Sequence, residues 1–138
     1  MVCDSFAKQL LGASFRESKW TGKKYEWLQA SKSYKKASEI LLKEKDFVNV
    51  TELAECLGHC YFKAADQAET NKEFRKHMKQ AVKVYKKELE ILEGTIVENK
   101  RIKIIHFQAL IAYVEAVVER RLLEKRNYWM NGGFLRTK

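Results

Sequence analysis

The stretch from Asn49 to Gly94 reads NVTELAECLGHCYFKAADQAETNKEFRKHMKQAVKVYKKELEILEG, and it decides the fold. Thr70, followed three residues later by Glu73, is the capping-box pattern that begins a helix. Beyond it, apolar residues recur at steps of mostly three or four, as on one face of a helix of about six turns. These residues are Phe74, Met78, Ala81, Val82, Tyr85, Leu89 and Leu92. Gly94 is the type of residue that ends such a helix.

A second helix precedes the capping box, and small residues dominate it. We expect it to begin near Asn49 or Thr51, with Asn49 and Glu52 as a weaker version of the same cap. Its expected inward face is Leu53, Cys56 or Leu57, Cys60 or Tyr61, Ala64 and Ala68. Because small side chains let a neighbouring helix approach closely, the two helices are predicted to pair as an antiparallel αα-hairpin.

The whole chain is predicted to be one all-α domain of about five antiparallel helices, stacked as αα-hairpins. It contains no proline and only six glycines, which favours long helices over a strand-rich fold with many turns. The expected parts are a short helix within residues 1–19, central hairpins over 24–93 that begin with a helix at 24–44, a long helix at about 97–126, and a tail at 127–138.

The last helix is expected to turn a broad apolar band inward. This band is Ile102, Ile105, Phe107 or Gln108, Ala109, Ala112, Tyr113, Ala116, Val117 and Arg120. The pairs Ile104–Ile105 and Val117–Val118 widen it beyond one stripe, so the helix either buries two sides or offers the second to a partner. The tail is also apolar, with Tyr128, Trp129, Met130, Phe134 and Leu135. Both features favour a homodimer through the last helix and the tail.

The chain is basic, with 27 Lys and Arg against 18 Asp and Glu and a net charge of +9. This balance permits attraction to nucleic acid, anionic lipid or an acidic protein, or it is simply a solvated lysine-rich surface. No apolar run is long enough to span a bilayer, and the first residues, MVCDSFAKQLLG, lack the pattern of a secretory signal. With three cysteines, an odd number, we expect a reducing, cytoplasmic location.

Chemistry-bearing motifs are sparse. Cys56 and Cys60 lie four residues apart on one predicted helix, but a zinc site needs two more ligands, so we expect buried cysteines in a tight helix contact. There is no glycine-rich phosphate loop and no nucleophile or metalloprotease motif. Glu88, Glu90 and Glu93 are interpreted as helix-surface charge. The sequence therefore predicts no metal, no cofactor and no catalysis.

The residues from Leu57 to Tyr61, LGHCY, resemble the Leu-Gly-x-x-Tyr of the first helix of a tetratricopeptide repeat. Ala81 and Tyr85 resemble the small and aromatic residues of the repeat's second helix, and the region 25–125 as a whole is similar to tetratricopeptide and SNAP-like hairpins of archaeal type. The resemblance implies a right-handed helical array that binds other proteins. Gly58 and Ala81 are 23 residues apart and the closing proline is missing, so it implies stacked hairpins without a regular repeat count.

Our main functional prediction is a protein-interaction or scaffolding module. Stacked hairpins leave a concave surface that can hold a peptide or helix. Lysines at helical spacing follow the helix after Thr70, and Lys76, Lys79 and Lys83 are the residues expected to bind an acidic partner. The other interpretation is that these lysines are a solvated face.

Two alternatives involve nucleic acid. Arg101 and His106 form an R-x4-H pattern that is similar to the motif of HEPN-type ribonucleases. That resemblance implies His106 as general base or acid and Arg101 as the group that stabilises a phosphorane. The second alternative is nonspecific nucleic-acid binding through the lysines, which would show steep salt dependence.

Overall fold

The structure, a computed structural model, describes residues 21–130, with side chains to residue 124. This part of the chain forms four helices and no strand: α2 (Lys24–Lys43), α3 (Phe47–Asp66), α4 (Asn71–Glu93) and α5 (Lys100–Met130). The all-α prediction is therefore confirmed. The fifth helix that we expected, within residues 1–19, lies outside the described residues, as does the end of the tail beyond residue 130.

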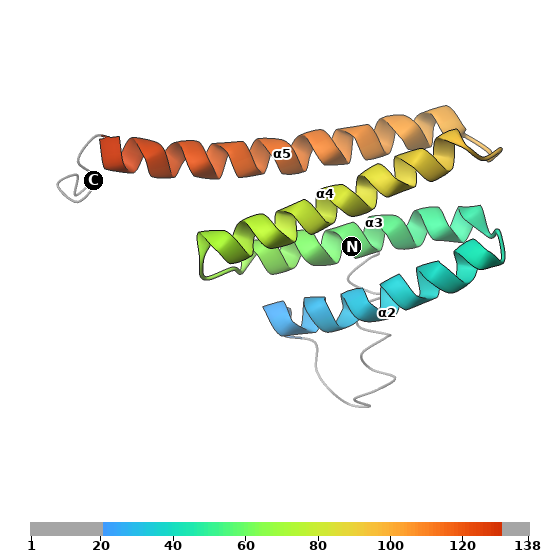
Figure 1. The fold of residues 1–138 in the computed structure, drawn as a ribbon, viewed down its shortest axis with the longest axis horizontal. Coiled ribbons are helices and arrows are strands. Elements are labelled where there is room, and N and C mark those ends of the chain that lie inside the picture. The colour runs from blue at the N-terminus through green and yellow to red at the C-terminus, as the bar shows by residue number, and fades with distance from the viewer. Residues whose placement is uncertain (1–20, 131–138) are drawn as a thin grey trace.

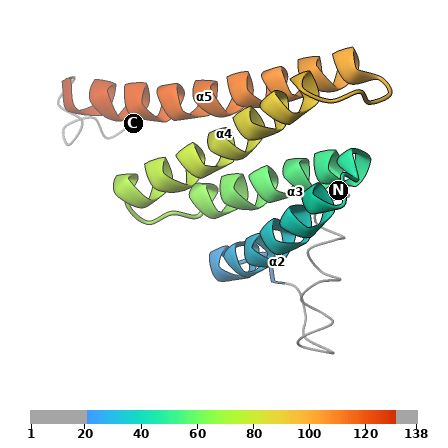
Figure 2. The same ribbon diagram turned by 45° about the vertical axis from the view of Figure 1, so that its right-hand side comes forward.

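The helices stack in chain order and alternate in direction (Figure 1). The main packing interfaces in the described part are α2 with α3, α3 with α4 and α4 with α5. Turned by 45°, the same stack shows α2 and α5 as its two outer layers, with α4 crossing α3 obliquely (Figure 2). The two hairpins that we expected, α2–α3 and α3–α4, are thus both present. None of these four helices has a stretch long and apolar enough to cross a membrane.

The caps fix where the central helices begin. Thr70 Oγ1 accepts a hydrogen bond from the Glu73 N–H at 3.1 Å, as predicted for α4, and that helix ends at Glu93 before Gly94. The Glu73 carboxylate, however, accepts from the N–H of Glu69, one residue before the cap. For α3 the predicted start was wrong, because Asp46 is the cap and accepts from the Asn49 N–H. Phe47 is the first residue of α3.

The turn after α2 and the turn before α5 each contain a left-handed residue that is not glycine. Lys45, between α2 and α3, has φ of 60°. Its N–H donates to Leu42 and the Asp46 N–H donates to Leu41, which is the Schellman pattern that closes a helix end. Asn99, with φ of 58°, stands directly before α5. The predicted start of that helix at 97 was therefore three residues early, and its end at 126 was four residues short.

Two apolar clusters hold the stack together, and α3 belongs to both. Between α2 and α3 the buried residues are Trp27, Ala30, Tyr34, Cys56, Leu57, Cys60 and Ala64. Among α3, α4 and α5 they are Ala54, Ala65, Phe74, Met78, Ala81, Tyr85, Leu92, Phe107, Ile111 and Val114. The small residues of α3 serve both interfaces, as the hairpin prediction requires.

Gly58 and Tyr85 mark a close approach of α3 and α4. A methyl group built on Gly58 would overlap the Tyr85 ring, with its carbon 2.7 Å from the phenolic oxygen. The same ring lies 5.8 Å from the Phe107 ring of α5, centroid to centroid. Tyr85 therefore connects α4 to the helix on each side of it.

The inward face of α5 agrees with the predicted band at Phe107 and in part at Val117, and differs from it elsewhere. Phe107, Ile111 and Val114 are the buried residues of its described part. Ile102, Ile105 and Tyr113, which we expected to point inward, are more than half exposed. The true inward residues also recur at steps of three and four, so periodicity alone could not choose between two apolar faces on one helix.

Replacing Gly58 by Ala tests the close approach. We expect Gly58→Ala to lower the free energy of unfolding by about 1–3 kcal/mol, as overpacking of a core does, although alanine favours helix by about 1 kcal/mol. Urea unfolding followed by circular dichroism measures this change. In a Tyr85→Leu background the same substitution should cost much less, and an equal cost in both backgrounds would contradict the contact.

Candidate partner-binding groove

An open groove of about 1080 Å³ lies between α4 and α5. Both helices supply its apolar residues, Met78 and Val82 from α4 and Val118 and Leu122 from α5. Met78 is buried and the other three are half-buried, so they form a floor that a bound side chain could cover. Concave sites lined mainly by apolar side chains, with a few placed polar groups, are the usual form of binding sites.

Charge divides the rim of this groove by helix. The α4 side carries Arg75, Lys79, Lys83, Lys86 and Lys87, together with Glu90. The α5 side carries Glu115 and Glu119. An extended ligand would therefore meet cations along one edge and carboxylates along the other, which favours one orientation of a ligand with two different faces.

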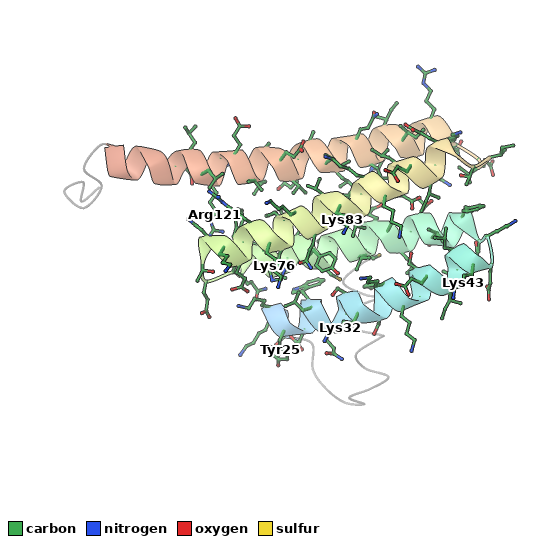
Figure 3. The ribbon with its side chains drawn as sticks, in the orientation of Figure 1. Tyr25, Lys32, Lys43, Lys76, Lys83 and Arg121 are labelled. Atoms are coloured by element: carbon green, nitrogen blue, oxygen red, sulfur yellow. The ribbon has the colours of Figure 1, made fainter. Side chains whose placement is uncertain are left out.

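The structure places two of the three predicted lysines on the groove. Lys79 and Lys83 both line it. Lys76 lies outside it, in a separate hollow at the start of α4 that also contains Lys72 and Lys79. Figure 3 shows Lys76 and Lys83 projecting from α4 and Arg121 extending from α5 toward that helix. Lys79 and Lys83 thus lie beside a hollow surface instead of facing only open solvent.

Two charged contacts position α4 at the end where the groove begins. The Arg121 guanidinium lies over the Phe74 ring, 4.0 Å from its centroid, which joins α5 to α4. The Lys24 ammonium lies 2.7 Å from the Glu73 carboxylate, which joins α2 to α4. This ion pair lowers the pKa of Glu73 and raises the pKa of Lys24.

Arg101 and His106, the residues of the ribonuclease alternative, do not converge on one face of α5. Five residues along an α-helix correspond to a rotation of about 140° around its axis. His106 Nε2 lies 3.0 Å from Glu55 Oε1 of α3, and both side chains are partly exposed. Arg101 is exposed. A site that uses both groups would therefore need a second chain or a substrate that wraps around the helix.

The cysteines of α3 are buried, as predicted, and neither forms a disulfide. Cys60 lies in the cluster between α2 and α3 together with Ala30 and Ala64. In the described residues no three His, Cys, Asp or Glu side chains come together in a way that could hold a metal ion.

Glu88 is the polar core residue that our interpretation of the sequence missed. We assigned it to surface charge, but its exposure is 1%. It follows Tyr85 by three residues and precedes Leu92 by four, so helical register had placed it on the apolar face of α4. That spacing was the available signal, and the acidic identity of the residue obscured it.

Glu88 is a buried carboxyl group whose hydrogen bond comes from Thr51 of α3. Thr51 Oγ1 lies 2.7 Å from Glu88 Oε2 and 2.9 Å from the Phe47 carbonyl oxygen. Thr51 Oγ1 is the donor in both contacts, so its one hydrogen is shared between the Glu88 carboxyl group and the Phe47 carbonyl. Burial raises the pKa of Glu88, against the opposing effects of Thr51 and the Lys103 ammonium. Its other oxygen has no hydrogen-bond partner among the described residues.

Stability should therefore depend on pH through Glu88. The folded-state pKa is raised above the ordinary value of 4.5, so the stabilising contribution is complete below that value and decreases as the pH rises toward the folded pKa. We expect Glu88→Gln, which cannot ionise, to raise the free energy of unfolding relative to the parent chain, and more at pH 8 than at pH 5. Urea titrations at both pH values measure this, with the exposed Glu90→Gln as control. An equal effect of Glu88→Gln at the two pH values would contradict the assignment.

The inferences above rest on this chain's own sequence and structure, because comparison with known proteins adds nothing to them. No protein-family model, no curated protein and no solved structure matches it. The similarity to tetratricopeptide and SNAP-like hairpins therefore stays a prediction.

Proposed function

We propose that this domain is a protein-interaction module whose α4–α5 groove binds an acidic, amphipathic helix of a partner. The observation that carries the proposal is the position of Lys79 and Lys83, which border an apolar floor. A solvated lysine face needs no such floor, whereas an amphipathic helix needs both a floor and a charged rim. In this complex the partner's apolar residues cover Val82 and Val118, and its carboxylates face the lysines of α4.

The two edges of the groove give the partner a preferred rotation about its own axis. Carboxylates on the side toward α4 meet Lys79, Lys83 and Lys86, while the same groups turned toward α5 would meet Glu115 and Glu119. Like charges brought together at an interface cost several kcal/mol when they are desolvated. The fit therefore selects a helix whose acidic residues lie along one side of its apolar stripe.

Charge reversal tests the proposed rim. The probe is a labelled synthetic amphipathic peptide with leucines at helical spacing and glutamates along one side, titrated with the full chain in fluorescence anisotropy. Because an exposed ion pair contributes about 0.2–1 kcal/mol, the loss of two such pairs should weaken binding by about two- to thirtyfold. We expect this loss for Lys79→Glu/Lys83→Glu, and a smaller effect for Lys76→Glu, whose side chain lies outside the groove.

The matched control reverses the same number of charges at the same spacing on another helix. Lys32→Glu/Lys36→Glu changes two exposed lysines of α2 and should leave binding nearly unchanged. An equal loss in the control would show attraction to the net charge of the chain alone. A peptide that keeps its glutamates but has serines in place of leucines should not bind. If it binds as well as the parent, the surface attracts any polyanion and the groove proposal fails.

The ribonuclease alternative rests on the contact of His106 with Glu55, since a carboxylate can orient an imidazole for proton transfer. Under this alternative the purified chain cleaves single-stranded RNA, and both His106→Ala and Arg101→Ala abolish cleavage. Gln108→Ala, at a neighbouring exposed position of α5, should have no effect. Cleavage that persists in the His106→Ala variant, or no cleavage by the parent chain, would rule this alternative out.

A further inference from the structure

The outer face of α5 carries an apolar stripe at coiled-coil spacing. Its members are Ile102, Ile105, Ala109, Ala112, Ala116 and Leu123. They follow one another at steps of three and four, and one further step of seven passes over Glu119. Ile102 is 68% exposed, Ile105 57% and Leu123 47%, and the three alanines are also exposed. A repeat of this kind is the pattern by which one helix packs along another.

No other described part of the chain covers this stripe. The buried residues Phe107, Ile111 and Val114 lie on the opposite side of the helix and face α4. His106 contacts Glu55 of α3 and Tyr113 contacts Phe62 of α3, so the side toward α3 is also occupied. Figures 1 and 2 show α5 as the last layer of the described stack. A helix with apolar residues all around is normally packed on more than one side.

Charge along α5 indicates what packs there. Residues 100–111 contain no carboxylate, and Arg101 is their exposed cation, because Lys100 donates to the Glu93 carbonyl and Lys103 acts on the buried Glu88. Residues 112–124 contain three carboxylates, Glu115, Glu119 and Glu124, while Arg120 is paired with Glu124 and Arg121 lies over Phe74. Two parallel copies would place the two Arg101 side chains near each other, whereas two antiparallel copies place Arg101 of each near the carboxylates of the other.

We infer that a second copy of this chain packs antiparallel along the outer face of α5, with the two-fold axis near Ala112. Ile102 and Leu123 lie ten and eleven residues on either side of Ala112, so the large residues of one copy meet those of the other at both ends. The alanines between them let the helix backbones approach closely at the centre. A two-fold contact of this kind is closed, so association stops at the dimer.

The expected dimer is weak and leaves the groove open. The stripe is about 32 Å long and a helix is about 10–12 Å wide, which gives a footprint of about 350 Å² on each copy, against about 800 Å² in a standard interface. Association should therefore depend on concentration in the micromolar to millimolar range. The groove adjoins the stripe at Glu119 but contains none of the stripe's apolar residues, so this inference does not rest on the proposed function.

The oligomeric state of the full chain tests the inference. We expect sedimentation velocity between about 5 µM and 1 mM to show a monomer that becomes a dimer. Ala112→Lys should weaken dimerisation at least tenfold, because it places two ammonium groups at the two-fold axis. It should leave the helix content unchanged, since Ala112 is exposed in the monomer. Gln29→Lys, an exposed change of the same charge on α2, should dimerise like the parent chain.

Cysteine cross-linking tests the direction. In a Cys3→Ser background, with Cys56 and Cys60 left in the core, the antiparallel arrangement predicts disulfides between Ile102→Cys and Leu123→Cys chains when the two variants are mixed. Neither variant should cross-link efficiently to itself. Self-cross-linking of Ile102→Cys would overturn the antiparallel arrangement, and a monomer at every concentration would overturn the inference as a whole.

Discussion

The contact between the Tyr85 ring and the bare backbone at Gly58 sets the distance between the two central helices. Because Gly58 has no side chain, α4 comes close enough for its aromatic ring to lie against α3 while the same ring contacts Phe107 of α5. One side chain thereby determines the spacing on both sides of α4. The groove inherits its shape from that spacing, since its floor is shared by α4 and α5.

Helix α5 has three distinct environments around its circumference. One side is core, packed on α4; a second borders the groove and carries Glu115 and Glu119; a third is the exposed apolar stripe through Ala112. The neighbouring α4 is simpler, with an apolar side and a basic side. The cations on one edge of the groove therefore come from the sequence of α4, and the carboxylates on the other edge come from the sequence of α5.

The sequence was sufficient to predict the ends of α4 but not the inward face of α5, for a physical reason. In α4 the cap, the apolar period and the terminal glycine all agree, and both ends were predicted correctly. In α5 apolar residues occur on every side. Which side is buried therefore depends on packing against α4, and the sequence of α5 alone does not contain that information. The helical spacing of Lys79 and Lys83 was enough to place both on one side of α4. Glu115 and the floor residue Val118 could not be predicted, because they join the groove only through the packing of two helices.

The order of the stack also has a consequence for how the molecule opens. Each described helix packs mainly against its neighbours in the chain, so most contacts are short in sequence and little loop closure is needed to form them. The last helix is held largely from one side and can separate while α2, α3 and α4 stay packed. Separation of α5 also opens the groove. Ligand binding in the groove and the local folding of α5 are therefore two measures of the same equilibrium.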